Sequence, residues 1–350
     1  MTYKFALIGC GRISYKHVES LRKIKNVEIV AVCDNRPEKA LKYAKELNIP
    51  HYVDYREMLS KEDIDVVNVL TPSGMHWDIA IDVMNHGKHV VVEKPMALKL
   101  ADADKMLEAA DRNGVRLFVV KQNRFNSAVV KTREAFDANR FGKLVMGTVR
   151  VRWARNQAYY DQDSWRGTWA YDGGVFTNQA SHHIDLLQWF LGDVESVMAM
   201  SRTALVNIET EDTGAAILRF TNGAIGIVEA TTATRPKDLE GSLSILGEKG
   251  TVEIGGFAVN TIKVWNFTEP LESDQNIIAE YGENPPNIYG FGHEAYFRHV
   301  IESLETGKSA LVDGFVGRKS IEIINAIYES IATGKQVFIH NQFKNSPLGK

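Results

Sequence analysis

The sequence predicts an α/β domain with a parallel sheet, followed by an α+β domain with a mixed or antiparallel sheet. Three observations support this fold class. In the first third of the chain, short apolar strand patterns alternate with amphipathic helix patterns, as in a parallel sheet with helices on both faces. Beyond residue 123, strand patterns follow one another with turns such as "TNGA" (221–224) between them, which favours antiparallel pairing. The length of 350 residues suffices for two domains, which we place at 1–122 and 123–350.

The elements of the first domain follow from its apolar periodicity. Strands are predicted at 4–9, 27–33, 65–70, 89–93 and 116–120, and helices between them at 12–24, 36–47, 75–86 and 99–113. Pro37 suits the first position of the second helix, because that position needs no backbone N–H donor. Gly87 and Gly114 directly follow helical runs, as C-terminal capping glycines do.

The second domain begins with a predicted helix at 127–138. Strand patterns then occur at 145–154, 194–204, 213–220, 224–233, 241–246, 250–254 and 261–267, and one helix at 174–192 interrupts them. Helical apolar spacing returns at 290–305 and 314–333. The segment 268–289 contains Pro270, Pro285 and Pro286 and predicts a long loop, and loops of that length are often functional.

The composition limits the class of partner. The chain is 44% hydrophobic and 24% charged, with a net charge of −3, so it offers no basic field for nucleic acid and no polybasic membrane segment. No apolar stretch reaches spanning length, and the N-terminus lacks the layout of a signal peptide. The two cysteines, Cys10 and Cys33, lie in or beside apolar strands. They predict buried free thiols in a reducing cytoplasm rather than a disulfide.

The stretch "GCGRIS" (9–14) follows the first strand and opens the first helix, as a dinucleotide-binding turn does. Gly9 permits the tight turn, and Gly11 lets the backbone approach a pyrophosphate at the helix N-terminus. Ser14 replaces the third glycine and is small enough for close packing. Asp34 ends the second strand and can accept a hydrogen bond from a ribose 2′-OH, which favours NAD, although Arg36 could accommodate a 2′-phosphate. The alternative is a structural glycine turn with a surface aspartate.

Three polar clusters follow strands of the first domain and should meet at one sheet edge. They are "TPSGMH" (71–76), "EKP" (93–95) and "KQNRFN" (121–126). Taken alone, each cluster also has a purely structural interpretation: a helix-start turn, a solvated ion pair and a polar linker, respectively. Lys94 lies between an apolar strand and a proline, where partial desolvation would lower its pKa towards values useful in catalysis.

A fourth cluster lies in the second domain, in "DGGVFTNQASHHIDLLQWFLG" (172–192). On the predicted helix, Asn178 and His182 share a face at i,i+4, and His182 and Asp185 meet at i,i+3. The alternative is one core histidine and one exposed histidine. We predict no metal site, because His182 and His183 are adjacent, project in different directions and lack partners at ligand spacing.

Together, "GCGRIS", Asp34, "TPSGMH", "EKP" and "GGVFTNQASHHID" resemble the Gfo/Idh/MocA oxidoreductases over nearly the whole chain. The resemblance implies an N-terminal Rossmann domain that binds NAD, and a C-terminal substrate-binding and oligomerisation domain with an open-faced sheet. It implies that Lys94 contacts substrate and nicotinamide. The family helix pattern D-x-G-x-H-x-x-D becomes Asn178, Ala180, His182 and Asp185. Asn178 cannot be a base and can only position the sugar, which leaves proton removal to His182 or Lys94.

Longer blocks resemble one subgroup, the UDP-N-acetyl-2-amino-2-deoxyglucuronate 3-dehydrogenases of bacterial O-antigen and lipopolysaccharide biosynthesis. These blocks are "VKQNRFN" (120–126), "YYDQDSWRGTWAYDGG" (159–174), "TNQASHHIDLLQWF" (177–190) and "NIYGFGHEAYF" (287–297). The resemblance implies NAD-dependent oxidation of the C3 hydroxyl of a UDP-sugar acid in the cytoplasm by a homo-oligomer, with a tetramer favoured. In some members NADH stays bound and is reoxidised by 2-oxoglutarate, which makes 2-oxoglutarate a candidate second substrate.

Such a substrate carries a diphosphate and a carboxylate, and arginine suits bidentate recognition of both. The candidates are Arg124, Arg152, Arg155 and Arg166. Tyr159, Tyr160 and Trp165 could stack or hydrogen-bond. The alternative for this aromatic run is sheet packing or a subunit interface, and for Trp169 the two interpretations are nearly balanced. The resemblance also implies that a Trp-Arg pair, here Trp165–Arg166, approaches the cofactor.

The predicted catalytic residues are Lys94 and His182: His182 accepts the hydroxyl proton, and protonated Lys94 stabilises the developing alkoxide. The predicted cofactor-binding residues are Gly9, Gly11, Arg12, Ile13, Asp34, Asn35, Arg36, Thr71, Pro72, His76, Glu93, Lys94, Gln122, Trp165 and Arg166. The predicted substrate-binding residues are Lys94, Gln122, Asn123, Arg124, Arg155, Tyr160, Asn178 and His182. Three other functions remain open: another sugar or inositol dehydrogenase, a catalytically silent NAD-binding sensor, and an aldehyde or imine reductase.

Overall fold

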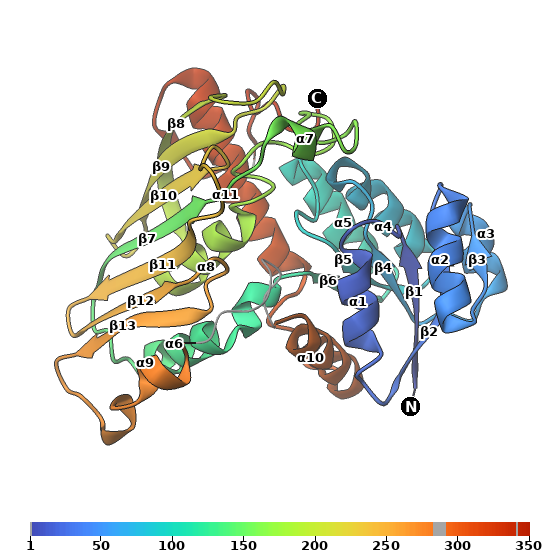
Figure 1. Cartoon of the computed structure of the whole chain (residues 1–350), viewed down its shortest axis with the longest axis horizontal. Coiled ribbons are helices and arrows are strands. Elements are labelled where there is room, and N and C mark those ends of the chain that lie inside the picture. The colour runs from blue at the N-terminus through green and yellow to red at the C-terminus, as the bar shows by residue number, and fades with distance from the viewer. Residues whose placement is uncertain (1, 283–291, 341) are drawn as a thin grey trace. The chain divides into compact units, whose positions relative to one another are not determined.

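A computed structural model describes residues 2–282, 292–340 and 342–350. The chain divides into two compact units (Figure 1). The first unit comprises Met1–Lys121 and His293–Arg318, and the second comprises Gln122–Gly292 and Lys319–Lys350.

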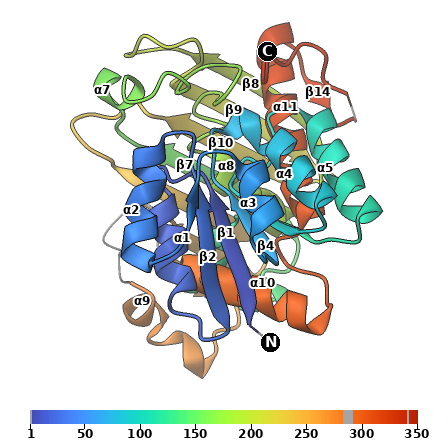
Figure 2. The same cartoon turned by 90° about the vertical axis from the view of Figure 1, so that its right-hand side faces the viewer.

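The first unit is built on a six-stranded parallel sheet in the order β3-β2-β1-β4-β5-β6, which confirms the predicted Rossmann-type α/β fold. Figure 2 shows its strands β1, β2 and β4 among the surrounding helices. The strands are β1 (Tyr3–Ile8), β2 (Val27–Cys33), β3 (His51–Tyr52), β4 (Val66–Val69), β5 (His89–Val92) and β6 (Leu117–Val119). The helices are α1 (Ser14–Leu21), α2 (Pro37–Leu47), α3 (Tyr55–Lys61), α4 (His76–Asn85) and α5 (Leu100–Arg112), with a short 3₁₀ turn, η1 (Ser73–Met75).

Two elements of this unit escaped sequence analysis, β3 and α3. The strand has only two residues, too few to show an alternating pattern. The helix has seven residues and begins after Asp54, whose side chain accepts a hydrogen bond from the backbone N–H of Arg56 at 2.9 Å. Strands β1, β4 and β5 are neighbours, so the residues that follow them lie along one edge of the sheet.

Helix α10 (Gly292–Thr306) packs with the first unit, although sequence analysis had assigned 123–350 to the second domain. The Phe297 ring lies 6.2 Å from the Phe5 ring and 5.2 Å from the His17 ring. The backbone N–H of Val119 also donates to the carbonyl oxygen of Val312 at 2.9 Å. The apolar face of α10 thus packs over the parallel sheet of the first unit. No sequence pattern reveals this contact between residues so far apart in the chain.

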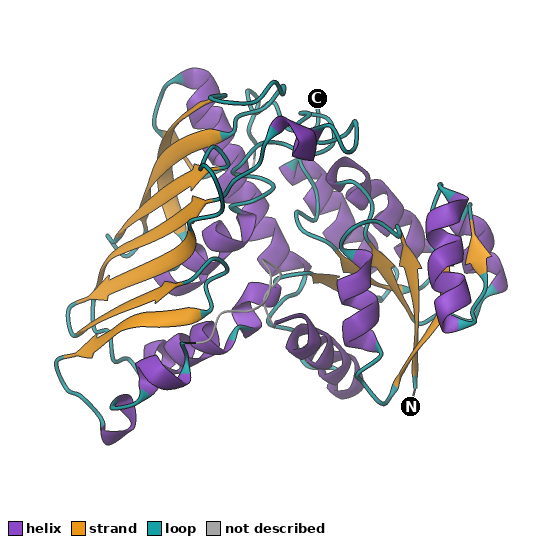
Figure 3. Cartoon of the chain, viewed as in Figure 1, coloured by secondary structure: helices purple, strands orange, loops and turns teal. Residues whose placement is uncertain are grey.

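The second unit contains an eight-stranded mixed sheet in the order β13-β12-β11-β7-β10-β9-β8-β14. Figure 3 draws the strands in orange. Strands β7 and β10 are parallel, and the other neighbours are antiparallel. The strands are β7 (Leu144–Arg152), β8 (Val194–Arg202), β9 (Thr213–Phe220), β10 (Ile225–Thr231), β11 (Glu240–Gly247), β12 (Gly250–Gly255), β13 (Thr261–Phe267) and β14 (Val337–Phe338). The helical elements are η2 (Gln122–Phe125), α6 (Ser127–Asp137), α7 (Gln157–Tyr160), α8 (Ser181–Leu191), η3 (Glu272–Asp274), α9 (Ile277–Glu280) and α11 (Gly314–Thr333).

Helix α8 lies against one face of this sheet. A Cβ atom at Gly147 on β7 would stand 2.8 Å from methyl carbons of Leu187 and Leu191, so glycine lets the helix approach closely. The opposite face exposes apolar side chains in register: Met198 on β8 is 53% exposed and pairs with Ile217 on β9, which is 60% exposed. The predicted open-faced sheet is therefore confirmed.

Two predicted segments differ in detail. The helix expected at 174–192 begins only at Ser181, so Asn178 lies in the preceding turns and does not share a helical face with His182. The loop expected at 268–289 contains the short elements η3 and α9, while Pro285 and Pro286 lie outside the described residues.

Candidate active site

The turn after β1 has the geometry of a dinucleotide-binding turn. Gly9 has a φ of 99°, and a Cβ atom there would stand 2.7 Å from the carbonyl oxygen of Leu70, so only glycine fits. At Gly11, no heavy atom of the described chain lies within 4 Å of a built Cβ, which leaves open space above the turn. Ser14 is fully buried and donates to the carbonyl oxygen of Gly11 at 2.6 Å, so it closes the turn in place of a third glycine.

Asp34 is held rigidly at the end of β2. Its Oδ2 accepts the backbone N–H of Cys10 at 2.7 Å, and its Oδ1 accepts the backbone N–H of Arg36 at 2.8 Å. The carboxylate therefore links the glycine turn to the end of β2, the place from which it can accept a ribose hydroxyl. Burial and then the charge of Asp34 raise the pKa of Cys10 and of Cys33 to about 12. Both thiols are free and buried, as predicted.

Other predicted cofactor residues line the same sheet edge. Arg12, Asn35 and Arg36 are exposed, whereas Ile13, Thr71, Pro72 and Lys94 are partly buried. The Oγ1 atom of Thr71 is buried and has no hydrogen-bond partner within the described part of the chain. An unpartnered hydroxyl and open space at Gly11 both fit a bound dinucleotide, so the residues present suit NAD.

His76 links the loop after β4 to the loop after β5 through hydrogen bonds. It is 1% exposed, and its ring nitrogens lie 2.7 Å from the carbonyl oxygen of Thr71 and 2.8 Å from that of Pro95. Burial lowers the pKa of His76, and the two carbonyl hydrogen bonds oppose that shift. The imidazole thus ties the loop after β4 to the "EKP" segment that carries Lys94.

Glu93 is part of a buried cluster that sequence analysis missed. Its Oε1 lies 2.9 Å from Nε2 of His17, and its Oε2 accepts the backbone N–H of Lys94 at 3.0 Å. Burial opposes ionisation of Glu93, but the hydrogen bond from His17 and the charges of His17, His293 and Lys94 together outweigh it and lower the pKa of Glu93 to about 2. The ligand atoms of His17, Glu93 and His293 lie within 4.8 Å of one another, a spacing that could hold a metal ion. The hydrogen bonds of Glu93 to His17 and to the Lys94 backbone give this cluster a structural role next to Lys94.

In the second unit, the side chain of Gln122 reaches His182 at the start of α8. The Gln122 Nε2 atom lies 3.2 Å from His182 Nε2, and both residues are buried. An amide nitrogen can only donate, so the His182 Nε2 atom is the acceptor and carries a lone pair. A neutral imidazole with that lone pair has the protonation state that a general base requires.

Arg124, a predicted substrate residue, is 3% exposed and paired with Asp185 of α8. Its Nε donates to Asp185 Oδ2 at 2.8 Å and its Nη2 to Oδ1 at 2.9 Å, and its guanidinium lies 4.7 Å from the Trp189 ring centre. Neighbouring Asn123 is also buried. The pairing gives Arg124 a structural function, and its role towards substrate stays a prediction.

Arginine and aromatic side chains gather beyond the end of β7. Arg166 Nη1 donates to the Tyr159 hydroxyl at 3.0 Å, and the guanidiniums of Arg166 and Arg155 lie 4.8 and 5.3 Å from the Tyr159 ring centre. Arg166 also lies 4.5 Å from the Trp165 ring centre. Arg155 contacts Asp238 at 3.0 Å. We name Tyr159, Trp165, Arg155 and Arg166 the arginine–aromatic cluster.

Other residues of the region are engaged in packing. Tyr160 is 6% exposed, its hydroxyl lies 3.1 Å from Thr232 Oγ1, and burial raises its pKa to about 12. Arg152 is paired with Glu229 and Glu240 across the sheet. The Trp169 ring stands 5.4 Å from the Tyr328 ring in an edge-on contact.

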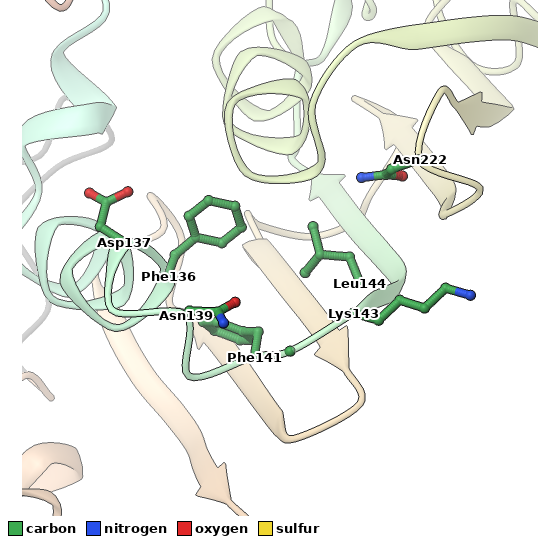
Figure 4. A pocket seen from close by; sticks show the side chains of 8 residues that line it. Phe136, Asp137, Asn139, Phe141, Lys143, Leu144 and Asn222 are labelled. Atoms are coloured by element: carbon green, nitrogen blue, oxygen red, sulfur yellow. The ribbon is translucent and has the colours of Figure 1, made fainter.

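A surface pocket of about 460 Å³ lies elsewhere in the second unit (Figure 4). It is lined by Phe136, Asp137, Asn139, Phe141, Gly142, Lys143, Leu144 and Asn222. Asn222 donates to the carbonyl oxygen of Leu191 at the C-terminal end of α8, whereas His182 lies at the N-terminal end. The pocket is therefore separate from the candidate site. The described residues also include no helix with the length and apolar character needed to cross a bilayer.

Substitution of two glycines in this turn should have different effects, one on stability and the other on NAD binding. Gly9→Ala introduces both a positive-φ strain and a clash with Leu70, so we expect a lower melting temperature. Gly11→Ala meets open space, so we expect an unchanged melting temperature and a loss of NAD affinity of at least about tenfold, because the methyl group occupies space that the pyrophosphate needs. Calorimetry and NAD titration check both. Normal NAD affinity in Gly11→Ala would contradict the assignment of this turn.

The buried Glu211 predicts a pH-dependent stability. Burial raises its pKa from 4.5 to about 7, against hydrogen bonds from Tyr328 and Phe176 and with a further rise from the charge of Asp172. The folded state therefore holds a proton that the unfolded state releases, and stability is lost as pH rises from 4.5 to about 7. We expect Glu211→Gln to gain about 2–3 kcal/mol relative to the unsubstituted protein between pH 5 and pH 8. Measurement of the free energy of unfolding of both proteins at pH 5 and at pH 8 tests this prediction. The same difference between the two proteins at both pH values would refute it.

Two family models match this chain. The Gfo/Idh/MocA model described as an oxidoreductase family with an NAD-binding Rossmann fold matches residues 3–121. The Gfo/Idh/MocA C-terminal domain model matches residues 129–253.

Solved structures and curated proteins are also similar. The WlbA dehydrogenase of Bordetella pertussis, in complex with NADH and UDP-GlcNAcA, is 43% identical with a TM-score of 0.93, covering 97% of this chain and 98% of that chain. The Chromobacterium violaceum WlbA complex with the same ligands is 41% identical with a TM-score of 0.91, covering 98% and 97%. The myo-inositol 2-dehydrogenase of Thermotoga maritima is 27% identical over 91% of this chain and 96% of its own length.

Proposed function

Because this chain belongs to the Gfo/Idh/MocA oxidoreductase family and carries its NAD-binding Rossmann domain, we propose that it oxidises the C3 hydroxyl of UDP-N-acetyl-2-amino-2-deoxyglucuronate (UDP-GlcNAcA) to a ketone. One observation carries the choice of substrate. Two structures that contain NADH and UDP-GlcNAcA are 41–43% identical to this chain over nearly its full length. The inositol dehydrogenases of Thermotoga maritima and Bacillus subtilis are 26–27% identical, which supports a sugar or polyol dehydrogenase in general.

NAD, when bound, supplies the hydride acceptor. His182 accepts the proton of the sugar hydroxyl at Nε2, once that hydroxyl has replaced the Gln122 side chain as the hydrogen-bond donor to this atom. Lys94, as an ammonium, stabilises the negative charge that develops on the hydroxyl oxygen. Lys94 belongs to the first unit and His182 to the second.

The diphosphate and the carboxylate of the proposed substrate must be bound by positively charged side chains and hydrogen-bond donors. In the proposal, the arginine–aromatic cluster binds the diphosphate or carboxylate, because Arg155 and Arg166 are partly exposed while Arg124 is buried in its pair with Asp185. Gln122, Asn123 and Asn178 orient the sugar through their amide groups.

An assay of NADH formation with UDP-GlcNAcA tests the proposal, run with and without 2-oxoglutarate and followed by mass measurement of the product. We expect a product two hydrogens lighter than the substrate. Product that forms only with 2-oxoglutarate, without net NADH, means that the cofactor is recycled while bound. Turnover of myo-inositol but not of the UDP-sugar would overturn the proposed substrate. NAD binding without turnover of any sugar would favour a sensor.

The exposed face of the second unit's sheet supports assembly into a homo-oligomer, with a tetramer favoured. Met198, Ile217 and Ile227 form a row across β8, β9 and β10, in which Met198 and Ile217 are exposed and Ile227 is partly buried. Exposed apolar surface of this kind marks an interface. We expect light scattering to show an oligomer and Ile217→Arg to reduce its size. Leu271→Arg, at a residue 52% exposed near η3, is the control. A monomeric unsubstituted protein would refute this part.

A further inference from the structure

The turn before α8 is held by a buried carboxylate that sequence analysis did not single out. Asp172 is 2% exposed, and its Oδ2 accepts the backbone N–H of Gly167 at 2.8 Å. Its Oδ1 accepts a hydrogen bond from the side-chain nitrogen of Asn178. All three residues belong to the second unit, within the segment that leads to His182.

We propose that Asp172 is a positioning residue that fixes the orientation of the Asn178 amide for binding of a sugar hydroxyl; the inference rests on the proposed function. A carboxylate can only accept hydrogen bonds, so Asn178 must turn its nitrogen towards Asp172. The amide oxygen is then the atom that Asn178 presents on its other side, where it accepts a hydrogen bond from a substrate hydroxyl. The opposite amide orientation would present a donor instead and would bring the amide oxygen against the carboxylate.

The identities of residues 172 and 178 are therefore coupled. An aspartate at 178 would place a second carboxylate within hydrogen-bonding distance of the buried Asp172, and both cannot be ionised there without a large cost. With an aspartate at 172, residue 178 must carry a donor that also fits the space of an aspartate, and asparagine meets both conditions. This coupling accounts for the presence of asparagine at position 178, where the family pattern has aspartate.

The backbone around Asn178 is fixed by a second buried group, Tyr328 of α11. Its hydroxyl accepts the backbone N–H of Gly174 at 3.1 Å and the hydroxyl proton of Thr177 at 3.0 Å, and it donates to Glu211 at 2.7 Å. Because these bonds hold the Gly174 backbone and the Thr177 side chain on the N-terminal side of Asn178, the main freedom left to Asn178 is rotation of its side chain. Asp172 removes that freedom.

The experiment compares the full-length protein with three variants: Asp172→Asn, Asn178→Asp and the exchange Asp172→Asn/Asn178→Asp. In the exchange variant, an asparagine at 172 can still accept the Gly167 N–H through its oxygen while donating to the new carboxylate. We measure kcat, KM for UDP-GlcNAcA and the melting temperature of each. Asp212→Asn is the matched control, because Asp212 is 1% exposed and accepts the backbone N–H groups of Ala204 and Leu205, at 2.8 Å each.

We expect Asp172→Asn to raise KM by at least about tenfold, the effect of losing one charge-assisted hydrogen bond, with a smaller change in kcat. Asn178→Asp should lower both activity and melting temperature, and the exchange should recover the melting temperature and most of the KM. The control should lower the melting temperature and leave KM unchanged. A normal KM in folded Asp172→Asn, or an exchange variant no better than the two single variants, would overturn the inference.

The melting temperatures separate this inference from the proposed function. If the unsubstituted protein does not turn over UDP-GlcNAcA, the proposed substrate fails, but the stability cycle still reports whether residues 172 and 178 form a donor–acceptor pair. Additive effects of the two substitutions on melting temperature would then refute the pair itself.

Discussion

Replacing Lys94 by methionine should lower turnover by a factor of about 100 to 10,000, the usual range for loss of a proton-transfer or charge-stabilising group. Methionine keeps an unbranched side chain of similar length and removes only the ammonium. Lys94 directly follows β5, and its backbone N–H is fixed by Glu93, which His17 holds as a carboxylate. We therefore expect an unchanged melting temperature and an unchanged affinity for NAD.

Steady-state kinetics with UDP-GlcNAcA and calorimetric titration with NAD provide the measurements. Lys99→Met is the matched control, because Lys99 lies five residues along the same segment and is exposed. Near-normal turnover in the Lys94 variant would remove Lys94 from the reaction and leave His182 as the sole candidate for proton transfer. Lost turnover in the control as well would indicate damage to the segment rather than to the chemistry.

Replacing Asp185 by asparagine should destabilise the protein by about 3–5 kcal/mol, because the guanidinium of Arg124 would stay buried without a counter-charge. Both side chains are 2% exposed, and two hydrogen bonds of 2.8 and 2.9 Å join them. With an unfolding entropy of about 2.1 cal/mol/K per residue, the expected fall in melting temperature is about 4–7 °C.

The double variant Arg124→Met/Asp185→Leu should recover part of this loss, because it removes both charges together. Asp137→Asn is the control: it breaks a pair with Arg133 at 2.7 Å in which the aspartate is 59% exposed, and it should cost less than about 1 kcal/mol. Equal losses in Asp185→Asn and Asp137→Asn would show that burial does not set the strength of the Arg124–Asp185 pair.

Features with a local cause could be predicted from the sequence. The glycine turn, Asp34 and the strands of the parallel sheet follow from residues that are close in the chain and from periodicity, and the structure has them as expected. The parallel Rossmann-type sheet of the first unit and the open mixed sheet of the second unit are likewise confirmed.

Features set by distant residues escaped prediction. In the turns that precede α8, the carboxylate of Glu211 accepts the backbone N–H of Phe176, 35 residues earlier, and no helical period reveals that bond. The buried pair of Arg124 with Asp185 joins residues 61 apart, so an arginine interpreted as a substrate ligand has a structural partner. The Glu93–His17 bond spans 76 residues in the same way.

The assignment of α10 to the first unit has a consequence for how the protein is made. The chain passes between the two units at Lys121/Gln122, at Gly292/His293 and at Arg318/Lys319. A ribosome that has produced only the first 122 residues has delivered a sheet whose covering helix is still missing. The cover that Phe297 gives to Phe5 and His17 can form only after almost the whole polypeptide has emerged. A gene fragment that ends at residue 122 would leave this apolar surface open, and a fusion that joins 293–318 to it by a short linker would supply the missing helix.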